Sequence, residues 1–166
     1  MKQNVWLETD FLWLQPLTEK WETIRDYAVS KTPKYKPYKA AEVHNGLWSI
    51  YGLRNKTNSW SMPDPVMDQL FGLLPFQPFL AAFSCLSSGA EIYPHEGFTD
   101  DVIRFHLGLI CPPDNIMKLG DIEYTWYNGK WLIFNDRITH SVWNKGSLPR
   151  YVLIMDFYRT DIGLDT

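Results

Sequence analysis

Between Phe79 and Phe157 the sequence alternates apolar and polar residues in a series of short runs. A period of two residues is typical of β-strands that bury one face and expose the other. The runs are 79–86, 91–94, 102–110, 122–127, 130–134, 139–143 and 151–157. Between two of them lies Asn128-Gly129, a pair typical of a two-residue hairpin turn. About seven short strands in succession predict an antiparallel β-sandwich or barrel.

Helical patterns precede these strands. Apolar residues in segment 16–28 recur every three or four positions, which predicts an amphipathic helix. Asp64-Pro65 is a typical N-cap and first-turn pair, and it predicts a second, short helix. The apolar residues of that helix expected to face inward are Val66, Leu70, Phe71 and Leu74. Segment 47–53 predicts a strand, followed by a polar turn over 55–61.

The chain has 166 residues, of which 45% are hydrophobic, enough to bury one core. We expect a single domain over residues 1–166, with a helical part at about 1–78 and a β core at about 79–160. The net charge of −3 provides no basic surface for nucleic acid. No apolar run approaches the roughly 20 residues of a membrane span, and the N-terminus lacks a signal-peptide pattern. These observations predict a cytoplasmic protein with no nucleic-acid partner and no membrane anchor, and they make no prediction of oligomeric state.

Charged side chains occur within two of the predicted strands. Arg104 and His106 share one face of strand 102–110, whose other face is apolar. Arg150 opens an apolar strand, and an inward-facing arginine there needs an anionic partner. A dicarboxylate would supply one, because the planar guanidinium forms paired hydrogen bonds with a carboxylate and stays charged.

Two histidines, His95 and His140, lie at the edges of predicted strands. Neutral imidazole is the commonest protein ligand of first-row metals. The pattern therefore predicts a metal and an anion inside a barrel. An alternative fits the two histidines alone equally well, in which both are hydrogen-bonded structural residues.

The runs 84–106 and 134–156 resemble the aspartyl/asparaginyl β-hydroxylase family. The residues that carry the resemblance are Ser84, Pro94-His95, Gly97, Arg104-Phe105-His106-Leu107-Gly108-Leu109, Phe134-Asn135-Asp136, His140-Ser141-Val142-Trp143 and Arg150. The resemblance implies an Fe(II)- and 2-oxoglutarate-dependent dioxygenase. It also implies a mainly β fold, with a double-stranded β-helix (jelly-roll or cupin-like) core and N-terminal helices packed on it.

The resemblance implies that His95 and His140 are the metal ligands. Many enzymes of the wider superfamily add a carboxylate two residues after the first histidine. Here that residue is Gly97, as it is in the β-hydroxylase family, which works with two protein ligands and water. Neither Glu96 nor Asp100 is expected to bind the metal, because Glu96 would point to the other face of its strand.

The resemblance also implies a binding site for 2-oxoglutarate. Ser84 and Arg150 would bind the distal carboxylate of the cosubstrate. Arg104 and His106 would lie near the metal-chelating end of the cosubstrate. Arg104 is also expected to act in catalysis, together with His95 and His140. A looser similarity adds Trp48 to this set.

The implied reaction consumes O2 and 2-oxoglutarate, releases succinate and CO2, and hydroxylates an unactivated carbon. The expected substrate is an Asp- or Asn-type residue or amino acid, free, carrier-bound or in a peptide, modified at its β-carbon. Segment 31–39, which interleaves lysines with tyrosines, would form either a rim for a carboxylate-bearing substrate or a solvated connector. Two alternatives remain: a halogenase, since the position at Gly97 leaves room for halide, and a non-catalytic barrel that binds a small acid.

Overall fold

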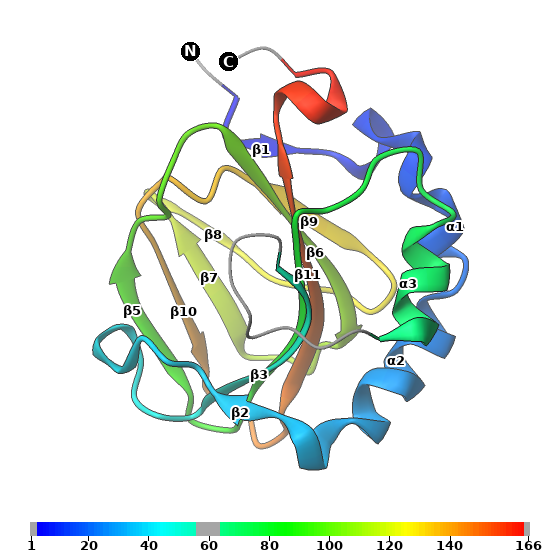
Figure 1. Cartoon of the computed structure of the whole chain (residues 1–166). Coiled ribbons are helices and arrows are strands. Elements are labelled where there is room, and N and C mark those ends of the chain that lie inside the picture. The colour runs from blue at the N-terminus through cyan, green and yellow to red at the C-terminus, as the bar shows by residue number, and fades with distance from the viewer. Residues whose placement is uncertain (1–2, 56–63, 165–166) are drawn as a thin grey trace.

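The computed structural model describes residues 3–55 and 64–164, and the polar turn expected at 55–61 lies outside them except for Asn55. Strands form two antiparallel sheets, a major one of seven strands and a minor one of four (Figure 1). The strand order is β1-β9-β6-β11-β4-β3-β2 in the major sheet and β5-β10-β7-β8 in the minor sheet. The strands are β1 (Val5–Trp6), β2 (Lys36–Pro37), β3 (Trp48–Asn55), β4 (Leu80–Leu86), β5 (Glu91–His95), β6 (Val102–Ile110), β7 (Asn115–Leu119), β8 (Ile122–Tyr124), β9 (Trp131–Phe134), β10 (His140–Asn144) and β11 (Arg150–Tyr158).

An apolar layer lies between the two sheets. The minor sheet contributes Ile92, Met117 and Val142, and the major sheet contributes Val152 and Ile154, all of them buried. Alternating side chains place these residues on the facing surfaces, as the period-two pattern requires. The predicted mainly β, jelly-roll fold is thereby confirmed.

Helices cover the other face of the major sheet (Figure 1). They are α1 (Gln15–Thr18), α2 (Trp21–Ser30) and α3 (Pro65–Phe71), with single 3-10 turns η1 (Glu8–Asp10), η2 (Leu12–Leu14), η3 (Thr32–Lys34), η4 (Ala41–Val43) and η5 (Thr160–Ile162). A second apolar core joins them to the sheet, and it includes Leu17, Ile24, Phe105 and Leu153. Because the same strands separate the two cores, the charged residues on the inner face of β6 and β11 are isolated from the helices.

Two helical expectations need correction. The single helix expected over 16–28 is two helices, because the chain turns between α1 and α2. In α3, Val66 is 44% exposed, whereas Met67 and Phe71 are fully buried. Asp64 caps the helix by accepting a hydrogen bond from the Met67 backbone nitrogen at 3.1 Å, and the resulting helical phase turns Val66 outward.

Two strand expectations also need correction. Strand β7 has no counterpart in the predicted set, although it pairs with β10 along its whole length. Asn128-Gly129 is a turn, but it does not form a hairpin, because β8 and β9 lie in different sheets. Gly129 adopts a φ of +72° and donates its backbone N–H to the Gly108 carbonyl at 2.8 Å, so the turn carries the chain from one sheet to the other.

Candidate active site

The two predicted metal-ligand histidines lie opposite each other at the ends of neighbouring strands of the minor sheet. His95 is the last residue of β5 and His140 is the first residue of β10, and the two are paired in the strand register. Their ring centroids are 4.3 Å apart. The pairing of antiparallel strands therefore brings together side chains that are far apart in the sequence.

Backbone carbonyls fix the tautomer of both histidines. The Nδ1 atom of His95 lies 2.8 Å from the Tyr93 carbonyl oxygen, and that of His140 lies 2.7 Å from the Ile138 carbonyl oxygen. Since a carbonyl only accepts hydrogen bonds, each Nδ1 carries the proton and each Nε2 keeps its lone pair. A carbonyl partner at the distal nitrogen is the usual arrangement of a metal-binding imidazole.

Asp136 occupies the space beside these histidines. Its Oδ1 lies 3.4 Å from the Nε2 of His140, so two hydrogen-bond acceptors face each other, and a cation would stabilise that arrangement. A β-carbon on Gly97 would lie 2.7 Å from the Asp136 Cγ and 2.8 Å from its backbone oxygen. Asp136 thus fills the space into which a carboxylate side chain at position 97 would project.

Gly97→Ala is expected to displace the Asp136 carboxylate, because the added methyl group has no space beside it. Shifting a charged side chain next to a metal ligand should lower affinity for a divalent cation by about tenfold. Titration with Co(II), followed by its visible absorption, measures the change. Ser141→Ala, on the same strand as His140, is the control and should leave the affinity unchanged. Gly89→Ala is unsuitable as a control, because the positive φ of Gly89 would add backbone strain. Equal affinities of Gly97→Ala and the wild type would contradict this account.

Arg104 is held by two aspartates. Its Nε and Nη2 donate to the two carboxylate oxygens of Asp156 at 2.9 and 2.7 Å, and its Nη1 donates to Asp136 at 2.6 Å. Asp156 lies directly across from Arg104 in the register of β11 and β6. Burial opposes the charge of Arg104, but the two aspartates outweigh it and raise its pKa, while burial raises the pKa of Asp156. The guanidinium therefore orients Asp136 toward the histidines.

The other end of the inner face carries buried donors that have no acceptor. Arg150 is 2% exposed, and its Nε and Nη1 have no hydrogen-bond partner among the described residues. Burial lowers the pKa of Arg150 to about 10, so it stays protonated at neutral pH. Its guanidinium lies 4.1 Å from the centre of the Trp126 ring. Unpaired buried donors are rare and costly, which indicates a site for an anion.

His106 adds a further donor between the two arginines. Trp126 donates its Nε1 hydrogen to Nδ1 of His106 at 3.2 Å, and burial holds the pKa of His106 well below its usual range. The neutral ring must then carry its proton on Nε2, which is buried and has no partner among the described residues. His106 and Arg150 together present three donor nitrogens that have no partner among the described residues.

Ser84 and Trp48 complete this end. Trp48 donates its indole hydrogen to the Ser84 Oγ at 2.9 Å, and Ser84 is 1% exposed. Since the serine oxygen accepts from Trp48, its own hydrogen is available to a ligand. Trp48 is in turn stacked on Tyr38 at a centroid distance of 4.0 Å, which places Tyr38, near the end of segment 31–39, beside the site.

One cavity brings together every residue that the sequence predicted for the site. Its lining consists of Trp48, Ser84, Ile92, His95, Arg104, His106, Met117, Phe134, His140, Val142, Arg150 and Ile154. Within the part of the chain that the structure describes, no point is surrounded by three metal-ligand side chains. The donor set fits a metal held by two protein ligands and a small dianion held at the opposite end.

Three residues that organise this site were not predicted from the sequence. Asp136 is part of the Phe134-Asn135-Asp136 motif that carries the family resemblance, but no role in the site was predicted for it. No role was predicted for Asp156 or Trp126 either. A charged residue inside the apolar run of β11 was the available signal for Asp156, because a buried carboxylate requires a partner. His44 lies outside the site residues; it is 5% exposed, and its two nitrogens contact the Tyr38 carbonyl and the Gly46 N–H.

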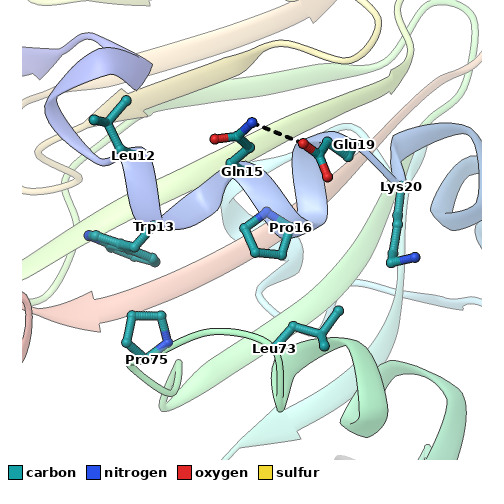
Figure 2. A pocket seen from close by; sticks show the side chains of 8 residues that line it. All are labelled: Leu12, Trp13, Gln15, Pro16, Glu19, Lys20, Leu73 and Pro75. Atoms are coloured by element: carbon teal, nitrogen blue, oxygen red, sulfur yellow. Dashed lines mark hydrogen bonds between the residues drawn. The ribbon is translucent and has the colours of Figure 1, made fainter.

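A second, open groove lies among the helices (Figure 2). Its walls are η2 with α1 on one side and the segment after α3 on the other. The lining residues are Leu12, Trp13, Gln15, Pro16, Glu19, Lys20, Leu73 and Pro75. Gln15 donates to Glu19 at 2.9 Å, so these two polar groups already satisfy each other. The groove belongs to the helical layer and shares no residue with the histidine cavity.

Comparison with known proteins points to one family. The family model described as Aspartyl/Asparaginyl beta-hydroxylase matches residues 18–160. The human aspartyl/asparaginyl beta-hydroxylase is 27% identical over 161 residues, which cover 90% of this chain and 21% of that protein. The ornithine lipid ester-linked acyl 2-hydroxylase of Rhizobium tropici is 37% identical over 82 residues, which cover 48% of this chain and 29% of that protein. The chain thus spans between about a fifth and a third of the length of these relatives.

Solved structures share the fold. A prolyl-4-hydroxylase from Pseudomonas putida has a TM-score of 0.57 at 17% identity, covering 85% of this chain and 86% of that one. HygX from Streptomyces hygroscopicus, solved with nickel and 2-oxoglutarate bound, has a TM-score of 0.58 at 11% identity, covering 85% of this chain and 78% of that one. Over the described residues, no helix has the length and apolar character needed to span a membrane.

Proposed function

The chain belongs to the aspartyl/asparaginyl beta-hydroxylase family, and on that basis we propose that it is an Fe(II)- and 2-oxoglutarate-dependent hydroxylase. The family agrees with the enzyme class predicted from the sequence. One observation carries the proposal: a single cavity has two imidazole Nε2 lone pairs at one end and three unpaired buried donors at the other. That combination suits a metal chelated by a keto acid whose second carboxylate extends away from it.

His95 and His140 would hold the metal. Their Nδ1–H groups are engaged by carbonyls, so the rings are oriented before the metal binds. Asp136 would supply negative charge beside His140 in place of a third protein ligand. Arg104 would act as a positioning residue for Asp136, since three of its N–H groups are already used by aspartates.

Arg150 and Ser84 would bind the distal carboxylate of 2-oxoglutarate, and His106 would donate to the cosubstrate between that end and the metal. The register supports this order, because Arg104 lies opposite Asp156, His106 lies opposite Ile154, and Arg150 begins the same strand. Trp48 would hold the Ser84 hydroxyl in a donating orientation.

When bound, Fe(II) would use O2 and 2-oxoglutarate to insert one oxygen atom into a C–H bond, releasing succinate and CO2. The chain's own contribution is orientation and the exclusion of water. Met117, Phe134 and Ile154 give the cavity apolar walls, and the exclusion of water by these walls would limit turnover without substrate.

We propose an Asp- or Asn-type residue or amino acid as the substrate, hydroxylated at its β-carbon, and the family description supports this choice. A small molecule or a peptide could reach the histidines, because His95 is only partly buried. The Rhizobium relative is named as an acyl hydroxylase, which adds acyl chains to the substrates worth testing.

The test is to incubate the purified chain with Fe(II), labelled 2-oxoglutarate and air, with and without candidate amino acids, peptides and lipids. Hydroxylation predicts succinate, CO2 and a product that gains one oxygen atom. A product containing chlorine, formed only with chloride present, would indicate a halogenase. The structure argues against a halide beside Gly97, because the Asp136 carboxylate occupies that space. Binding of 2-oxoglutarate without any succinate would indicate a non-catalytic barrel.

A further inference from the structure

We propose that Glu96 is a positioning residue of the metal site, whose side chain connects the two loops that adjoin His95 and His140. It would act without binding the metal itself. This inference rests on the proposed function, because it takes the histidine pair as the metal ligands.

Both histidines lie where the pairing of β5 with β10 stops. His95 ends β5, His140 begins β10, and the register between these strands shifts between His140 and Val142. Residue pairs at the end of a strand ladder open more readily than pairs at its centre. The backbone ladder alone is therefore a weak constraint on the distance between the two imidazoles.

The side chains next to the histidines further constrain the distance between the two imidazoles. Glu96 follows His95 in the sequence, and Thr139 precedes His140. The Thr139 hydroxyl donates to Glu96 Oε1 at 3.0 Å, and Arg137 forms an ion pair with Glu96 Oε2. Both carboxylate oxygens of Glu96 are thus bound to the loop that leads into His140.

Two further contacts join the same loops. The Gly97 backbone N–H donates to the Asp136 carbonyl oxygen at 2.7 Å, and Asn135 donates its side-chain amide to Asp100 at 3.1 Å. Segments 96–100 and 135–139 are therefore joined by several hydrogen bonds and one ion pair directly beside the histidines.

The expected effect is on metal affinity more than on stability. Glu96 and Arg137 have side chains that are 47% and 42% exposed, so the ion pair adds little to the folding free energy. Holding two ligands at their working separation before the metal arrives reduces the cost of binding it. Outer-shell contacts of this kind change metal affinity measurably.

The test is a titration of the full chain with Co(II) alone, followed by its visible absorption band. Glu96→Ala and Arg137→Ala should each lower the Co(II) affinity about three- to tenfold and alter the band. Glu96→Gln should recover part of the loss, because its amide oxygen can still accept from Thr139. Asp68→Ala is the matched control, since it removes a comparably exposed ion pair with Arg54, distant in the fold, and should leave the affinity unchanged.

Unchanged Co(II) affinity in both Glu96→Ala and Arg137→Ala would overturn the inference. A loss beyond about 100-fold in Glu96→Ala, with no effect of Arg137→Ala, would also overturn it and would make Glu96 a metal ligand. Failure of the proposed function looks different: His140→Ala would then bind Co(II) as well as the wild type does.

Discussion

His140→Ala is expected to lower the affinity for Fe(II) or Co(II) by more than about 100-fold and to abolish succinate formation. With one imidazole removed, His95 would be the remaining protein ligand of the proposed site, and Asp136 would lose the imidazole that faces it at 3.4 Å. The fold should persist, since the ring lies at the start of a strand whose apolar inward residue, Val142, is untouched.

His44→Gln is the matched control for this change. His44 and His140 are both 5% exposed, but both nitrogens of His44 are used in local backbone contacts. The control variant should therefore keep the metal affinity of the wild type. A His140→Ala protein that binds Co(II) normally, as judged by the visible absorption band, would remove the basis of the two-histidine site.

Arg150→Met is expected to raise the dissociation constant for 2-oxoglutarate by about 100-fold or more while changing the Co(II) affinity little. Removing one partner of a buried charge pair typically costs about 2–5 kcal/mol of binding free energy. Fluorescence or calorimetric titration of the metal-loaded protein measures the effect, and Arg150→Lys, which keeps the charge but not the planar fork, should fall between the two.

The same substitution should not lower the stability of the ligand-free protein. Burial lowers the pKa of Arg150 to about 10, which corresponds to about 3 kcal/mol against its charged form. Methionine fills a similar volume without a charge, so the free energy of unfolding should stay the same or rise. In thermal denaturation, 2-oxoglutarate should stabilise the wild type but not Arg150→Met; equal stabilisation of both would contradict the assigned role.

The predictions for Arg104 and Arg150 illustrate what a sequence pattern conveys about a buried charge. Alternation alone placed Arg104 and His106 on one face of a strand, and the structure has both lining the cavity. It could not show that Asp156, far along the chain, would lie opposite Arg104 and bind its guanidinium at 2.7 and 2.9 Å. As a result, only the structure indicates that Arg104 orients Asp136 and that Arg150 is the arginine left free for an anion.

The layer architecture and the residue types of the site follow from local sequence pattern. Period-two alternation groups side chains on the two faces of a strand, so the β fold and the shared face of Arg104 and His106 were predicted from it. Register, helix phase and sheet membership depend on contacts between distant segments, so they required the three-dimensional structure. For that reason β7, the outward turn of Val66 and the sheet change at Gly129 were not predicted. The contact of Asp136 with Gly97 has the same origin, since packing of two loops sets it and no local pattern encodes it.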